Sequence, residues 1–126
     1  MVDDDASVRR ALRRLLKVLG FNVLVFAGAK ELLAGEFPTE NACMLLDIYI
    51  PEMGTTAVSE SLARSGRQLP TILMSGHDDE RTRRIMRETE SIARLFKPFD
   101  EKILLRAIQT ALMERPKSKP ACRSDS

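Results

Sequence analysis

The feature that most constrains the fold is a regular alternation of short apolar segments with segments of helical periodicity. After Met1-Val2, apolar segments of strand length occupy residues 22–26, 42–47, 70–75 and 92–96. A helical pattern follows each segment, at residues 6–19, 29–34, 55–64, 80–89 and 101–114. Strands that alternate with helices favour a parallel sheet covered on both faces, joined by right-handed crossovers. The sequence therefore predicts one doubly wound α/β domain.

Residues that satisfy free backbone groups mark the predicted helix ends. Asp5 is placed to cap the first helix, and Thr55 or Thr56 to cap the third, because their side-chain oxygens can accept first-turn N–H groups. Gly20 and Gly66 follow the first and third helices, where a left-handed residue commonly ends a helix. These signals predict the helix boundaries independently of the apolar pattern.

The composition is that of a globular protein. The chain has 126 residues, of which 44% are hydrophobic and 30% charged, and no apolar run approaches the roughly 20 residues that cross a bilayer. The N-terminus is acidic, and Cys43 and Cys122 make no disulfide framework, so we expect a cytoplasmic protein. A net charge of +2 gives no reason to expect nucleic-acid binding. Residues 115–126 are rich in Lys, Ser and Pro, and we expect a disordered tail after a domain at 1–114.

Polar residues stand where the predicted strands end. Asp3 and Asp4 follow the first strand, Asp47 the third, Ser75 the fourth and Lys97 the fifth. Parallel strands bring their carboxyl ends to one edge, so we expect these side chains to gather there. Clustered carboxylates repel one another and favour a cation, and oxygen ligands suit Mg²⁺ better than zinc. A lysine and a hydroxyl beside them are groups that an incoming phosphoryl group needs.

Each of these residues also has a plainer interpretation. Asp47 can open the turn before Pro51, and aspartates near a helix start are often only caps. Ser75 can be a simple strand end, Lys97 a solvated lysine and His77 a surface residue. The functional interpretation is favoured because several strand ends carry suitable chemistry in order.

Four stretches of the chain resemble the receiver domain of two-component response regulators, most closely those of the nitrogen-fixation type. They are Val2-Asp3-Asp4-Asp5, Leu46-Asp47-Ile48-Tyr49-Ile50-Pro51-Glu52-Met53, Ser75-Gly76-His77 and Lys97-Pro98-Phe99. The resemblance implies a flavodoxin-like fold with five helices around five parallel strands in the order 2-1-3-4-5. The first strand would be truncated, since only Met1 and Val2 precede the acidic residues.

The resemblance also implies a role for each site residue. Asp47 would accept a phosphoryl group from a phosphohistidine of a sensor histidine kinase, with Lys97 pairing to the phosphoryl oxygens and Ser75 turning in to hydrogen-bond one of them. Mg²⁺ would be the cofactor, held by Asp3, Asp4, Asp47 and the backbone carbonyl of Tyr49. Such a protein is a phosphoacceptor that assists its own phosphorylation and dephosphorylation, not an enzyme with an external substrate.

Departures from the family pattern keep an alternative open. Arg94 stands where the family has a Tyr or Phe that moves inward with Ser75, and no output domain follows within the chain. A degenerate receiver that binds a partner without phosphorylation is therefore the second interpretation. An intact switch could instead dimerise through the face made by the fourth helix, fifth strand and fifth helix. A phosphatase is disfavoured, because Tyr49 stands where such an enzyme needs a second acid, and no membrane or direct nucleic-acid partner is expected.

Overall fold

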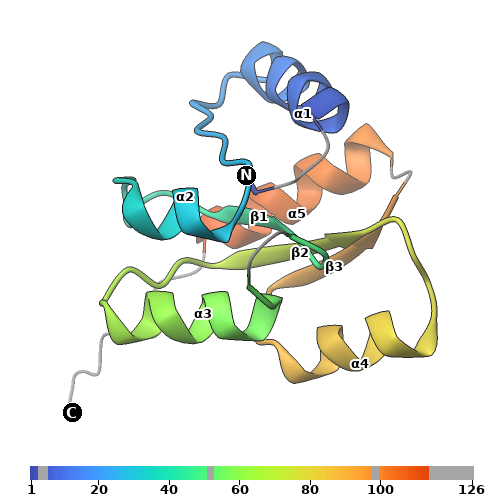
Figure 1. Ribbon diagram of the computed structural model, residues 1–126. Helices are drawn as coiled ribbons and strands as arrows, with labels where there is room; N and C mark the ends of the chain where they lie inside the picture. Colours follow the sequence, from blue (N-terminus) through green and yellow to red (C-terminus); the bar gives the residue numbers. More distant parts are fainter. Residues whose placement is uncertain (3–5, 51–52, 98–99, 114–126) are drawn as a thin grey trace.

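The computed structural model describes residues 1–2, 6–50, 53–97 and 100–113 (Figure 1). Within these ranges three strands form one parallel sheet in the order β1-β2-β3: β1 (Met44–Asp47), β2 (Thr71–Ser75) and β3 (Ala93–Phe96). The described ranges also contain five helices: α1 (Ala6–Val18), α2 (Ala29–Ala34), α3 (Thr55–Arg64), α4 (Glu80–Glu88) and α5 (Glu101–Met113). The predicted α/β architecture and its parallel sheet are confirmed.

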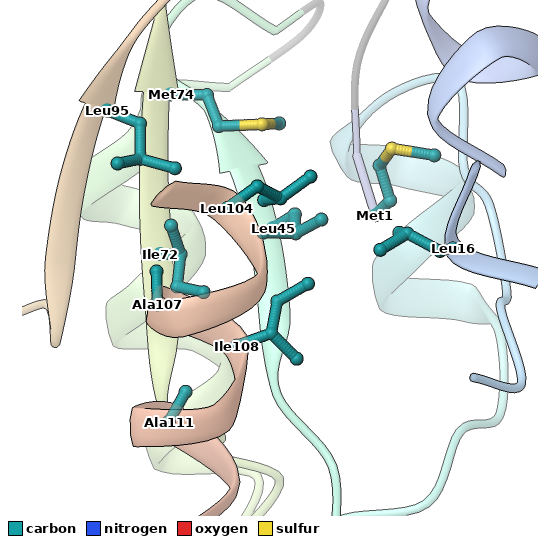
Figure 2. Close-up of a cluster of buried hydrophobic side chains, with 10 residues drawn as sticks. All are labelled: Met1, Leu16, Leu45, Ile72, Met74, Leu95, Leu104, Ala107, Ile108 and Ala111. Atoms are coloured by element: carbon teal, nitrogen blue, oxygen red, sulfur yellow. The ribbon is translucent and has the colours of Figure 1, made fainter. Parts of the chain in front are cut away.

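Helices cover both faces of the sheet, and alternate residues of each strand face opposite cores. One core joins Leu45 and Ile72 to α5, and the Leu16 side chain of α1 lies beside it (Figure 2). The other core joins Leu46 and Leu73 to α2, α3 and α4. Every residue of β1 and β2 is buried, as expected for strands with a helix layer on each side.

The predicted strand at 22–26 is not formed; the segment makes only an isolated bridge. Val2 pairs in parallel with both Phe26 and Leu46, so it lies between them. The Met1 ammonium donates to the Leu24 carbonyl at 2.9 Å, and the Phe26 N–H donates to the Met1 carbonyl at 2.9 Å. Five strands were predicted and three are found within the described ranges. Val2 makes a single bridge on each side, too short a ladder to hold the segment 22–26 as a strand.

A short apolar extension ahead of Met1 is expected to raise the stability of this chain. A cavity of about 480 Å³ lies beside Met1 and is lined by Val23, Leu24, Cys43 and Leu45. Strand residues placed there would pair backbone groups and bury apolar surface, and each buried unpaired group costs about 1–3 kcal/mol. We expect the urea midpoint to rise with an extension such as Val-Val-Ile-Val. A Gly-Ser extension of equal length is the control, and equal midpoints for the two extended chains would contradict the prediction.

The glycine signals at helix ends agree with the structure, and an aspartate caps α4. Gly20 and Gly66 have φ of 97° and 72°, in the left-handed region that favours glycine. Asp79 is the N-cap of α4, and its side chain accepts from the Thr82 N–H at 2.8 Å. Asp5 lies outside the described residues.

The prediction that Thr55 or Thr56 caps α3 is wrong. Gly54 occupies the N-cap position, and no side chain caps the helix there. The Thr55 hydroxyl instead donates to the Ile48 carbonyl at 2.6 Å, which ties the start of α3 to the end of β1. No helix within the described ranges is both long and apolar enough to cross a membrane.

Candidate functional site

The central contact of the site joins Asp47 to Lys97 across 50 residues of sequence. Asp47 ends β1, and Lys97 directly follows β3. Lys97 Nζ lies 2.7 Å from Asp47 Oδ2, and the side chains are only 21% and 10% exposed. An ion pair so shielded from water adds little net stability, because desolvation offsets the attraction. The ion pair instead holds a carboxylate and a cation side by side at the carboxyl edge of the sheet.

Backbone geometry fixes the second oxygen of the carboxylate. The Tyr49 N–H donates to Asp47 Oδ1 at 2.9 Å, so the chain turns immediately after β1. The Lys97 N–H donates to the Ser75 carbonyl at 2.6 Å, which anchors the chain at the end of β3 to the end of β2. Both charged side chains therefore project from backbone that is held by the strand ends.

Ser75 lies at the same edge, with its hydroxyl engaged in a local turn. Asp47 pairs with Met74 in the sheet, so Ser75 is one residue beyond the level of the carboxylate. Its side chain is fully buried, accepts from the His77 N–H at 3.0 Å and donates to the His77 carbonyl at 3.1 Å. To donate to a group attached to Asp47, this hydroxyl must give up the bond that it donates to the His77 carbonyl.

Contacts of the Tyr49 side chain were not predicted from the sequence, which gave this residue only a backbone role. The Tyr49 hydroxyl lies 2.8 Å from Thr82 Oγ1 on α4. The His77 ring meets the Tyr49 ring edge to face, with centroids 5.5 Å apart, and the Arg81 guanidinium lies 5.6 Å from the centroid. His77 is exposed, as predicted, but it packs on the loop that follows Asp47.

The predicted metal ligands are only partly within the described residues. Asp3 and Asp4 lie outside them, and the described part of the chain holds no group of three His, Cys, Asp or Glu residues suited to a metal. Asp47 and the Tyr49 backbone do lie together at the sheet edge. Their donors are carboxylate and carbonyl oxygens, the chemistry that Mg²⁺ prefers, so the described residues fit that ion.

Arg94 points away from the core, as its charge predicts. Its side chain is exposed on β3, and Nε donates to the Met86 carbonyl of α4 at 3.2 Å. This carbonyl partner was not predicted from the sequence. The contact ties β3 to the C-terminal half of α4 from outside the core.

Comparison with known proteins gives consistent matches. Residues 1–109 match the family described as response regulator receiver domain. The response regulator protein TmoT of Ectopseudomonas mendocina is 37% identical over 119 residues, which cover 94% of this chain and 54% of the relative. Nodulation protein W of Bradyrhizobium diazoefficiens is 33% identical over 125 residues, covering 98% of this chain and 55% of the relative. The chain thus spans about half the length of these curated relatives.

Solved structures show the same fold. The crystal structure of FixJ-N superposes with a TM-score of 0.77 at 26% identity and covers 88% of this chain and 89% of that one. The response regulator StyR superposes with a TM-score of 0.74 at 35% identity, covering 88% of this chain and 56% of that one.

Proposed function

Since this chain belongs to the response regulator receiver domains of two-component systems, we propose that it is a phosphoryl-accepting switch whose acceptor is Asp47. The observation that carries the proposal is the shielded Asp47–Lys97 pair at 2.7 Å, at the carboxyl edge of a parallel sheet. The phosphoryl donor is a phosphohistidine of a sensor histidine kinase. In this role the chain turns over no external substrate, and it assists only its own phosphorylation and dephosphorylation.

The chemistry follows from the positions of three side chains. An oxygen of Asp47 attacks phosphorus, an O–P bond forms, and the P–N bond to the kinase imidazole breaks as that ring takes up a proton from solvent. The Lys97 ammonium, already beside the carboxylate, lies close to the negative charge on the phosphoryl oxygens. The Ser75 hydroxyl turns from His77 to donate to one of those oxygens. Positioning before the reaction supplies most of what such a transfer needs.

We propose Mg²⁺ as the cofactor of this site. Asp47 and the Tyr49 carbonyl would hold it together with Asp3 and Asp4, which lie outside the described residues. When bound, the ion neutralises negative charge on the carboxylates and the phosphoryl group. The described oxygen donors support this assignment by their chemistry.

Labelling with a small phosphodonor tests the proposed function. Incubation of the purified chain with acetyl phosphate and Mg²⁺ is expected to add one base-labile phosphate, detected by intact mass. Removal of Mg²⁺ by a chelator is expected to suppress labelling, and Asp4→Asn is expected to weaken Mg²⁺ binding. Labelling that is indifferent to chelation, or that does not occur, would contradict the proposal.

The proposal also covers the strand order, the domain bounds and the surface for self-association. We propose that the complete sheet has the receiver order 2-1-3-4-5, and the isolated bridges from Val2 to Phe26 and Leu46 support this order. The domain covers residues 1–114, followed by a polar tail at 115–126.

Self-association would use the α4–β3–α5 face, where Phe96 and Ile103 are 37% and 50% exposed.

Arg94 is expected to weaken the dependence of that association on phosphorylation. A guanidinium cannot follow Ser75 inward, because a buried unpaired charge is too costly, and it is already bonded to the Met86 carbonyl outside the core. Arg94→Tyr should strengthen dimerisation that depends on the phosphoryl mimic beryllofluoride, measured by analytical ultracentrifugation with and without the mimic. A native chain that already dimerises strongly, and only with the mimic bound, would contradict this prediction.

The second interpretation, a receiver that binds its partner without phosphorylation, is favoured by the same external Arg94 contact.

A further inference from the structure

We propose that the Tyr49 side chain is the link that transmits the state of Asp47 and Ser75 to helix α4 in this chain. This inference rests on the proposed function, because it assumes that Asp47 is phosphorylated. It assigns a positioning role to the Tyr49–Thr82 hydrogen bond, whose two hydroxyl oxygens lie 2.8 Å apart.

Tyr49 is connected to both groups that change on phosphorylation. Its backbone N–H donates to Asp47 Oδ1 at 2.9 Å, so it senses the charge on that carboxylate directly. Its ring packs edge to face on His77, whose backbone holds the Ser75 hydroxyl through two hydrogen bonds. Tyr49 thus contacts Asp47 through its backbone and the loop after β2 through its ring.

The far end of the Tyr49 side chain is attached to α4, a helix with little apolar anchorage. The buried residues of α4 are Thr82 and Met86. Threonine hydroxyls tie it near both ends: Thr82 to Tyr49, and the C-cap Thr89 to Thr56 of α3 at 2.8 Å. Met86 and the partly buried Ile85 supply the apolar packing of α4, and these hydrogen bonds add direct ties near its two ends.

Phosphorylation would act on both attachments of Tyr49. Formation of the acyl phosphate removes the negative charge from the Asp47 carboxyl group itself, so the bond from the Tyr49 N–H loses its charge assistance. Movement of the Ser75 hydroxyl to the phosphoryl group frees the His77 turn on which the Tyr49 ring packs. The phenol then leaves Thr82, and the N-terminal turn of α4 loosens while Thr89 still holds the other end.

Such a link gives this chain a route to α4 that does not need an aromatic residue at position 94. Arg94 is exposed and bonded to Met86, so it cannot follow Ser75 into the core. Tyr49 and Arg94 contact opposite ends of α4. Tyr49 bonds to Thr82 in the first turn of the helix, and Arg94 bonds to Met86 in the last turn.

Amide hydrogen exchange of α4 tests the link in the full chain. Thr82→Val keeps the shape of the side chain and removes its hydroxyl, and Thr56→Val is the matched control at the other end of the helix. In the native chain, beryllofluoride with Mg²⁺ is expected to speed exchange in residues 80–88. Without the mimic, Thr82→Val should already exchange roughly three- to tenfold faster than the native chain, the factor for losing one hydrogen bond. The further increase caused by the mimic should largely disappear in Thr82→Val and persist in Thr56→Val.

Tyrosine fluorescence gives a second readout, because the chain has one tyrosine and no tryptophan. Emission of Thr82→Val without the mimic should resemble that of the mimic-bound native chain. An equal response of α4 to the mimic in the native chain and in Thr82→Val would overturn the link and leave the proposed function intact. A mimic response lost equally in Thr56→Val and Thr82→Val would also overturn it, since it would show a general loosening of α4. A native chain that neither labels nor responds would instead overturn the proposed function.

Discussion

Asp47→Asn is expected to abolish phosphoryl labelling of this chain. The amide has nearly the shape of the carboxylate, but it lacks the anionic oxygen that forms the acyl phosphate. It also cannot form the ion pair with Lys97, whose Nζ lies 2.7 Å from Asp47 Oδ2. We expect loss of more than about two orders of magnitude in initial labelling rate with acetyl phosphate and Mg²⁺, as for removal of a nucleophile.

The matched control is an exposed aspartate in the segment between β2 and α4. Asp78 is exposed and pairs with Arg83 at 2.7 Å, at the start of α4. Asp78→Asn should label like the native chain, because an exposed ion pair contributes little to fold or site. Persistent labelling of Asp47→Asn, or equal loss in both variants, would contradict the assignment of Asp47.

The stability of this chain is expected to rise by about 2 kcal/mol between pH 6 and pH 8. Burial lowers the pKa of the Met1 α-ammonium from its ordinary 8.0 to about 6. Between these values the unfolded chain binds a proton that the folded chain does not, so raising the pH favours the folded state. Below pH 6 both states are protonated, and the folded state bears the full cost of a buried charge.

Urea unfolding at several pH values measures this dependence, and acetylation of the Met1 amine is the control. The acetylated chain carries no charge there, so the rise assigned to Met1 should vanish. Burial raises the pKa of the nearby Cys43 thiol, which therefore stays neutral through this window. An identical pH dependence in the acetylated chain would show that other groups cause it.

The sequence correctly predicts the strands whose apolar pattern matches their burial in the folded sheet. β1 and β2 were predicted because continuous apolar runs mark strands buried on both faces, and the structure begins them within two residues of the expected positions. Asp47 and Lys97 were expected at one edge because parallel topology places strand ends together, and the structure brings them to 2.7 Å.

Features that depend on a partner far away in the sequence could not be predicted from it. The segment 22–26 has β-type residues, but its pairing depends on Val2, which can make only a single bridge on each side. Thr55 is a residue type that often caps helices, but its hydroxyl donates to the Ile48 carbonyl and does not cap α3. The Tyr49–Thr82 contact spans 33 residues, and only the aromatic residue two positions after Asp47 hints at it.

Chemical mapping of the phosphorylated residue tests the central claim most directly. Borohydride reduces an acyl phosphate on aspartate to the alcohol of homoserine, which marks the acceptor permanently for peptide mass spectrometry. After treatment with acetyl phosphate, Mg²⁺ and then borohydride, we expect homoserine at position 47 alone. Reduction at Asp3 or Asp4 in place of Asp47, or a phosphate found on His77, would contradict the account.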